Sequence, residues 1–151
     1  MTPILMVVLL VGVGLLVIGL FLKGLFSAIQ GAADAAIDQA HPAEDIVLRD
    51  GMANSLGLES RGPVQLRGNG GLVLTGEELH FLPLVGVAEV RVSLDQIRKV
   101  SLVRVHLGKT VGRRLLRVDF GEGAATDAVA FSVGDPDRWI AELTQRLPKA
   151  G

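Results

Sequence analysis

The chain has 151 residues, and its 15 Lys and Arg nearly balance its 16 Asp and Glu, giving a net charge of −1. This length fits one globular domain and a small additional element, and the charge balance excludes a globally basic nucleic-acid-binding protein and an acidic disordered chain. The chain has no cysteine, which excludes a disulfide framework, a thiolate metal site and a cysteine nucleophile. Its apolar fraction of 49% and mean hydropathy of +0.45 exceed those of an ordinary soluble domain.

The excess of apolar residues is concentrated near the N-terminus. Residues 4–22 contain sixteen apolar residues, three glycines and no charge. As a helix, this run spans about 28 Å, close to the thickness of the hydrocarbon core of a bilayer. The alternative is a cleaved signal peptide, which needs a shorter apolar run preceded by basic residues, and residues 1–3 contain none. We therefore expect a short tail at 1–3 and a retained transmembrane helix at 4–22.

The orientation in the membrane depends on Lys23, the one basic residue close to the apolar run. Lys and Arg are enriched on the cytoplasmic side of membrane helices, although a domain of about 100 residues can be translocated regardless of charge. We expect a single-pass protein of the cell membrane with a cytoplasmic C-terminal domain.

Residues 23–45 are expected to form a helical stalk and a hinge. Residues 24–41 are rich in alanine, and Pro42 disfavours a helical conformation at the residue before it, so the helix should end near His41. A short coiled-coil pattern is present but covers only about two heptads of mostly alanine, which favours a single helix lying on the membrane or on its own domain. This pattern consists of Phe26, Ile29, Ala33, Ala36 and Ala40.

Residues 46–148 have the pattern of an antiparallel β domain, followed by a tail at 149–151. Short alternating runs are separated by Gly, Asp and Asn, and the connections are too short for parallel crossovers. We expect a mainly β fold, a curved barrel of six or seven antiparallel strands. The expected strands are 64–66, 71–74, 78–81, 88–94, 100–106, 115–120 and 128–133.

The last element of the domain is expected to be a helix. Asp135 followed by Pro136 is typical of a helix N-terminus. Four apolar side chains then share one helical face, which can close an open end of the curved sheet. These side chains are Trp139, Ile140, Leu143 and Leu147.

Three segments together resemble bacterial pleckstrin-homology-like and GRAM-type domains. The hairpin at 70–81 matches the family pattern G-x-L-x-L-T-x-x-x-L-x-F, the strand at 90–100 resembles I-P-L-x-x-I-x-x-V, and a terminal helix begins at Asp135. The resemblance covers residues 60–148, and Ser93 stands where the family often has Pro. It implies a PH-like barrel that acts as a binding or scaffolding module, often at membranes. The phosphoinositide site of eukaryotic relatives lies near the first hairpin and does not transfer to this chain.

The sequence contains no pattern that indicates an enzyme, a cofactor or a metal site. The tripeptide 108–110, Gly-Lys-Thr, lacks the first glycine of a phosphate-binding loop and leads into a strand, so a hairpin turn is expected there. His41, His80 and His106 are widely spaced, and none has a partner at helical spacing. His80 alternates with Leu79 and Phe81, so we expect it to face outward. We therefore expect a non-enzymatic protein with no cofactor.

The charge distribution has one anomaly, a stretch between Asp95 and Asp119 that contains basic but no acidic residues. With Val103 facing the core, the two strands flanking residues 107–112 should bring Arg104 close to Arg117 on the outer face. A cluster of this kind attracts anionic lipid headgroups or an acidic partner. The alternative is neutralisation by acidic residues from elsewhere, such as Glu89, Asp95 or Asp127. The expected site consists of Arg98, Lys99, Arg104, Lys109, Arg113, Arg114 and Arg117.

The sequence therefore predicts a membrane-anchored PH-like domain that docks on anionic lipid headgroups through this basic face. The alternative is an interaction or scaffold module that assembles a membrane complex, or a homo-oligomer, through a strand edge or the groove beside the last helix. An enzyme whose site is not visible in the sequence is the remote alternative.

Overall fold

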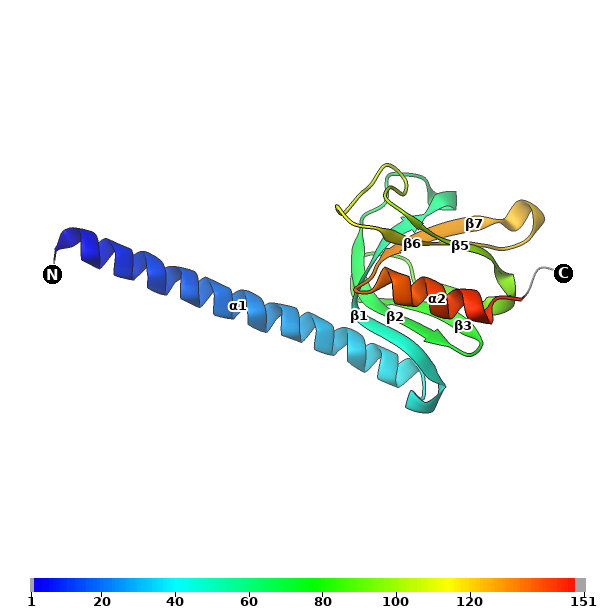
Figure 1. Cartoon of the computed structure of the whole chain (residues 1–151), viewed down its shortest axis with the longest axis horizontal. Helices are drawn as coiled ribbons and strands as arrows, with labels where there is room; N and C mark the ends of the chain where they lie inside the picture. The colour runs from blue at the N-terminus through cyan, green and yellow to red at the C-terminus, as the bar shows by residue number, and fades with distance from the viewer. Residues whose placement is uncertain (1, 149–151) are drawn as a thin grey trace.

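The computed structural model describes residues 2–148, in which a long helix is joined to a seven-stranded sheet and a short second helix (Figure 1). All neighbouring strands are antiparallel, in the order β4-β3-β2-β1-β7-β6-β5. This confirms the predicted mainly β fold with a helix at each end. Met1 and the expected tail at 149–151 lie outside the described residues. The elements are α1 (Pro3–Ala40), β1 (Ile46–Leu58), β2 (Gly68–Thr75), β3 (Glu78–Pro83), β4 (Val90–Ser93), β5 (Ile97–Val103), β6 (Leu115–Phe120), β7 (Asp127–Ser132) and α2 (Pro136–Arg146).

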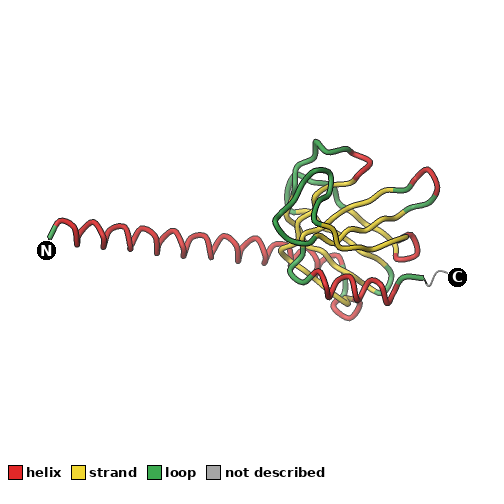
Figure 2. The backbone as a smooth tube through the Cα atoms, turned by 45° about the horizontal axis from the view of Figure 1, so that its top comes forward, coloured by secondary structure: helices red, strands yellow, loops and turns green. Residues whose placement is uncertain are grey.

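The sheet curls strongly. β4 and β5 stand at opposite ends of the strand order, yet only residues 94–96 separate them in the chain. Three residues bridge at most about 14 Å, so the two ends of the sheet must approach each other at this corner. Figure 2 shows the strands curving around a common interior. That interior holds the main core, whose largest buried side chains include Leu72, Leu74, Leu79, Phe81, Leu116 and Phe131.

The second helix forms where the sequence predicts it and packs as expected. The Asp135 side chain accepts a hydrogen bond from the backbone N–H of Arg138 at 3.1 Å, which satisfies one free donor of the first turn. Trp139 and Leu143 are buried in the main core, and Ile140 packs against it. α2 contacts β5 and β6, so its apolar face closes one side of the curled sheet.

The first helix is continuous through the predicted span and the predicted stalk. It ends at Ala40, because His41 precedes a proline and takes an extended conformation. Its first half projects away from the sheet, whereas its last turns pack on β1, β2 and β3 and bury Ala33 and Ile37 completely (Figure 1). The stalk therefore lies on its own domain. Gly71 permits this close packing, because a Cβ there would come within 2.8 Å of Ile37.

One predicted strand is wrong, one strand was not predicted, and one predicted strand is shifted. The run 64–66 is an exposed loop, and Val64 is 97% exposed. The longest strand, β1, was not among the expected strands, because Asp50 and Gly51 interrupt its alternation; the structure accommodates them at an irregularity between residues 50 and 53. β5 begins three residues earlier than expected and ends at Val103. The expected strands at 71–74, 78–81, 115–120 and 128–133 correspond to β2, β3, β6 and β7.

Candidate functional site

A tight turn organises the connection between β5 and β6, residues 104–114. His106 and Lys109 exchange two backbone hydrogen bonds, of 3.0 and 2.9 Å. Leu107 and Gly108 between them have φ angles of 51° and 71°, as the two central residues of a type I′ turn require. The hairpin turn predicted around Gly-Lys-Thr is therefore present. Figure 1 shows this connection (yellow) on the side of the sheet from which α1 projects.

Two further loops lie on the same side, against α1. Residues 66–69 and 84–86 line, together with Ile29 of α1, a groove of about 410 Å³. Arg67 Nη1 donates to the carbonyl oxygen of Thr110 at 3.3 Å, which links the first of these loops to the β5–β6 connection. We call the three segments 66–69, 84–86 and 104–114 the proximal surface.

The proximal surface combines exposed apolar and basic side chains. Leu66 is 78% exposed, Val85 80% and Val105 57%. Arg67 and Arg104 are exposed beside them. Ile29 follows Leu22, the last residue of the apolar run, by seven residues, which is about 10 Å along a helix. This end of the sheet is therefore the one closest to the apolar run.

Four of the seven predicted site residues lie on the β5–β6 connection, but most of them have internal partners. Arg114 pairs with Asp137 at 2.5 Å, and Arg113 Nε donates to Ser132 Oγ at 3.1 Å. Lys109 Nζ donates to the carbonyl oxygen of Leu56 at 3.1 Å. Among residues 2–148, the fourth, Arg104, forms no ion pair and is exposed.

The other three predicted site residues lie elsewhere. Arg98 and Lys99 follow Ile97 at the start of β5, at the far end of the sheet, where Arg98 pairs with Glu122 at 2.8 Å. Arg117 lies between Asp119 and Glu59, at 2.7 and 2.5 Å, and is only 23% exposed. Its hydrogen bonds to Asp119 and then to Glu59 raise the pKa of Arg117 above its ordinary value. The neutralising residues are thus different from the three expected, Glu89, Asp95 and Asp127.

The expected proximity of Arg104 and Arg117 is wrong. Arg117 pairs with Ser101 across the sheet, and Val103 pairs with Leu115. Leu102 packs against the main core. Val103, the next residue, packs on the opposite face of the sheet against a smaller apolar cluster. Both faces of β5 carry apolar side chains, so alternation alone assigned the wrong face to the core.

The structure brings together a second group of polar side chains, which the sequence analysis did not find. His80 does alternate with Leu79 and Phe81, but the end of α1 covers its face, and His80 is only 2% exposed. His41 Nε2 lies 2.8 Å from His80 Nδ1 and 3.8 Å from Glu78 Oε1. Burial, and then the neighbouring His80, lower the pKa of His41, which favours its neutral form.

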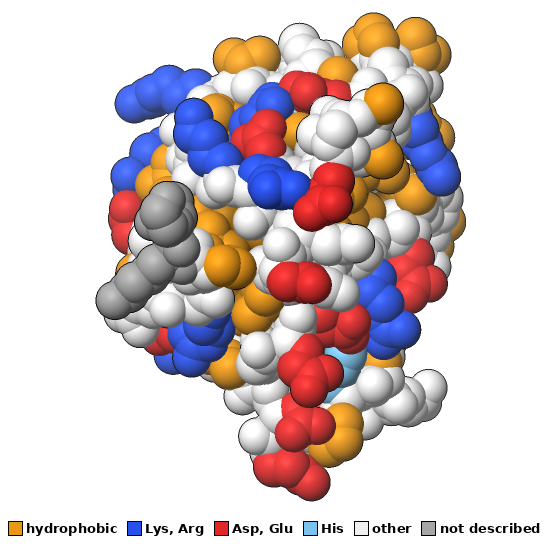
Figure 3. Space-filling view, turned by 90° about the vertical axis from the view of Figure 1, so that its right-hand side faces the viewer, with side chains coloured by type: hydrophobic (Ala, Val, Ile, Leu, Met, Phe, Trp, Pro, Cys, Tyr) orange, Lys and Arg blue, Asp and Glu red, His pale blue; other side chains and the backbone are white. Residues whose placement is uncertain are grey.

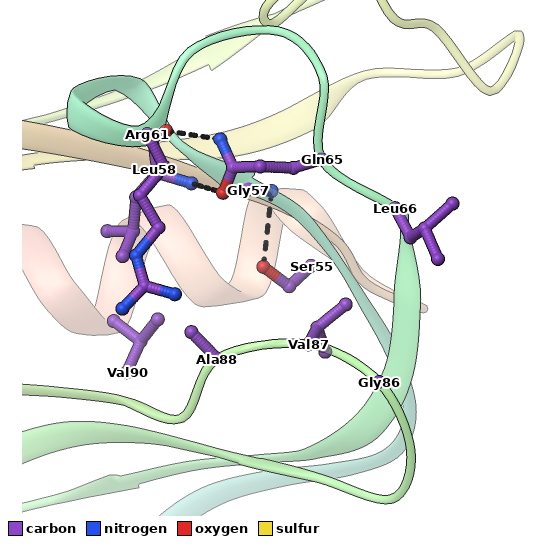
Figure 4. Close-up of a pocket in the computed structure, with 10 residues that line it drawn as sticks. All are labelled: Ser55, Gly57, Leu58, Arg61, Gln65, Leu66, Gly86, Val87, Ala88 and Val90. Carbon is purple, nitrogen blue, oxygen red and sulfur yellow. Dashed lines mark hydrogen bonds between the residues drawn. The ribbon is translucent and has the colours of Figure 1, made fainter.

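A small pocket between β1 and the loops at 61–66 and 86–90 is the least promising site. Its volume is about 150 Å³, below the usual range for small-molecule sites. Figure 4 shows the Gln65 amide bonded to Leu58 and the Ser55 hydroxyl accepting from the backbone of Gly57. These polar groups hold the loop and are not directed at a ligand.

No model of a known protein family matches the chain, and no curated protein matches it. The resemblance to PH-like and GRAM-type domains therefore stays a prediction from the quoted motifs.

Proposed function

We propose that this chain is a non-enzymatic single-pass membrane protein whose sheet domain, residues 46–148, docks on anionic lipid headgroups at the cytoplasmic surface through its proximal surface. The N-terminal helix is long and apolar enough to cross a membrane. Lys23 at the end of the apolar run favours a cytoplasmic domain. The PH-like resemblance is consistent with a binding module of this kind.

The observation that carries the proposal is the closeness of the proximal surface to the apolar run. Headgroups extend about 5–8 Å beyond the hydrocarbon core on each side, and Ile29 lies about 10 Å beyond the apolar run. α1 has no break between the run and the sheet, so no flexible linker holds the domain away. Loops that pack beside Ile29 therefore come close to the headgroup layer.

The side chains of the proximal surface suit that layer. Leu66, Val85 and Val105 are exposed and apolar, as membrane-interface residues often are. Arg67 and Arg104 are exposed next to them and can meet lipid phosphates. Each basic side chain near an anionic surface contributes about 1 kcal/mol. The site is thus smaller than the seven-residue face that the sequence predicts, and it includes Arg67.

No specific observation favours the alternative of an interaction module using a strand edge. The edge strand β4 has four residues, and the other edge strand, β5, packs against α2. A protein partner therefore enters as an outcome of the experiment below.

The test uses the full chain in nanodiscs, and its lack of cysteine permits single labels. Val105→Cys places a fluorophore on the proximal surface, and Ala124→Cys places one on the β6–β7 connection at the far end. We expect quenchers on lipid headgroups to quench the label at 105 much more than the label at 124. Quenching at 105 should increase with anionic lipid and decrease with salt.

Two charge reversals serve as test and control: Arg104 directly follows β5, on the proximal surface, and Lys99 lies near the start of the same strand. Arg104→Glu should weaken docking about 30-fold, since it changes the charge near the surface by two units, whereas Lys99→Glu should have little effect. Neither residue forms an ion pair within the described part of the chain. Equal quenching at 105 and 124, unaffected by lipid charge, would refute lipid docking and direct attention to a protein partner.

A further inference from the structure

The two histidines and one glutamate beyond the end of α1 come from separate elements that meet only in the folded chain. His41 follows the last residue of α1, and Glu78 and His80 lie on the same face of β3 because they are two residues apart. His41 and His80 are 7% and 2% exposed, and Glu78 is partly buried. The packing of α1 on the sheet brings these side chains together.

The distances between these side chains fit a metal site. One ligand atom from each residue lies within 4.8 Å of the other two, and the closest pairs are 2.8 and 3.8 Å apart. A tetrahedral zinc ion with ligands at 2.0–2.1 Å requires about 3.3 Å between ligand atoms. Reaching that spacing takes shifts of about half an ångström in these two contacts and of up to about 1.5 Å in the third, between His80 and Glu78.

The hydrogen bonds of His80 leave the correct nitrogen available. His80 Nε2 lies 2.6 Å from Glu89 Oε1, and a carboxylate only accepts, so Nε2 carries the proton. The unprotonated Nδ1 therefore points at His41. A carboxylate that holds the second ring nitrogen of a histidine is the usual support of a metal ligand in proteins.

Glu78 is held in place by Arg91, whose Nε lies 3.1 Å from Glu78 Oε1. A carboxylate offers about four lone pairs, so Glu78 can keep this contact and still bind a cation. The fold thus positions both carboxylates of the cluster, one as a ligand and one behind His80.

The cluster is open to solvent on one side. His41 and Glu78 line a cleft of about 430 Å³ whose other lining residues include Glu44, Asp45 and Glu77. Figure 3 looks at the end of the domain turned away from the projecting helix and shows a histidine beside a row of acidic side chains. Negative charge around the opening attracts cations, and the opening leaves room for a water ligand.

We propose that His41, Glu78 and His80 bind one divalent transition metal of the zinc class, which fastens the end of α1 to β3. Two imidazoles and one carboxylate form a ligand set that zinc accepts with a water in the fourth position. The inference is independent of lipid docking, because the cluster lies about 28 Å along the helix from the apolar run.

The experiment is a zinc titration of the full chain in detergent, without a histidine tag and after treatment with a chelator. Competition with a chromophoric chelator should give one zinc per chain, and Co²⁺ should give the visible absorption of a four-coordinate site. Zinc should also raise the melting temperature, because it binds the folded chain. His41→Gln should abolish both effects, and Glu89→Gln should weaken binding 10- to 100-fold.

Two adjacent glutamates provide a matched control. Glu77 and Glu78 both line the cleft, but Glu78 is the one within 3.8 Å of His41. Glu78→Gln should lose most of the zinc affinity, and Glu77→Gln, with the same change in charge, should keep it. Equal affinity in these two variants, or no stoichiometric binding by the unmodified chain, would overturn the proposal.

Discussion

At the scale of single residues, the turn at the tip of the β5–β6 connection places a leucine where the backbone favours glycine or asparagine. Leu107 has φ 51° and Gly108 has φ 71°. The left-handed region costs an ordinary L-residue about 1–2 kcal/mol, and asparagine considerably less. The chain keeps the turn in spite of this cost, because the strands on both sides are fixed by the sheet.

This cost predicts opposite effects for two substitutions. Leu107→Asn should raise the free energy of unfolding by about 0.5–1 kcal/mol, and Gly108→Ala should lower it by about 1 kcal/mol. A Cβ at Gly108 meets nothing within 4 Å, so the second effect comes from the backbone alone. Gly76→Ala, also in open space but without a positive φ, is the control. Denaturant unfolding measures all three, and a loss of stability in Leu107→Asn would contradict the argument.

A second residue, Asp127, ties the start of β7 to the segment after β1. Its carboxylate accepts hydrogen bonds from the Ser60 hydroxyl at 2.5 Å and from the Ser60 backbone N–H at 2.9 Å. Burial raises the pKa of Asp127, but the hydrogen bonds from Ser60 and Ala128 together outweigh burial and lower it below its ordinary value of 3.8. The folded state therefore favours the ionised carboxylate.

This shift predicts acid sensitivity. Because the pKa is lower in the folded state, the stabilisation by Asp127 is complete above about pH 4 and is lost as the pH falls through the folded pKa. Unfolding midpoints of the full chain, measured from pH 6 to pH 2, should decrease less steeply below pH 4 in Asp127→Asn than in the unmodified chain. Identical slopes in the two proteins would show that Asp127 does not contribute to the loss of stability in acid.

At the scale of elements, the contact between α1 and the sheet depends on a few side chains. Ile37 is fully buried against β2, and Gly71 leaves the space that it fills. Ile37→Ala should therefore lower the stability by about 2–5 kcal/mol, the usual range for such a truncation in a core. Leu25→Ala, on the same helix at a position that is 46% exposed, should have a much smaller effect on the packing of the sheet.

Hydrogen exchange of the β2 and β3 amides provides the measurement. In Ile37→Ala, α1 should separate from the sheet more often, so these amides should exchange faster. If the β2 and β3 amides exchange at the same rate in Ile37→Ala as in Leu25→Ala, the helix does not stabilise the sheet.

Local pattern was sufficient for elements with one apolar face and clear end signals. Residues 115–120 were predicted with the correct bounds, and α2 follows from Asp135, Pro136 and its apolar face. β1 was missed because its irregular segment interrupts the alternation of apolar and polar residues. In the structure, pairing with β2 and β7 on either side holds β1 in the sheet. For β5, a second apolar cluster lies on the outer face, so both faces carry apolar side chains and the sequence pattern does not show which face is the core.

At the scale of the whole molecule, the side-chain pairs that depend on distant contacts were not predicted. His41 and His80 are 39 residues apart, and only the docking of α1 brings them within 2.8 Å. Likewise, Arg117 pairs with Glu59 and Arg114 pairs with Asp137, and each pair joins residues that no local sequence pattern connects. The proximal surface was missed for the same reason, since it combines three segments that are far apart in the chain.

The unbroken helix couples the orientation of the apolar run to the position of the sheet domain. A helix without a hinge passes any rotation at one end to whatever is fixed at the other, and α1 runs from residue 3 to residue 40 without interruption. Helices adjust to bilayer thickness by tilting, on average by about 20°. Over the roughly 28 Å beyond the apolar run, such a tilt moves the far end sideways by about 10 Å. In the membrane arrangement proposed above, a thinner or thicker bilayer would therefore change which side chains of the domain face its surface.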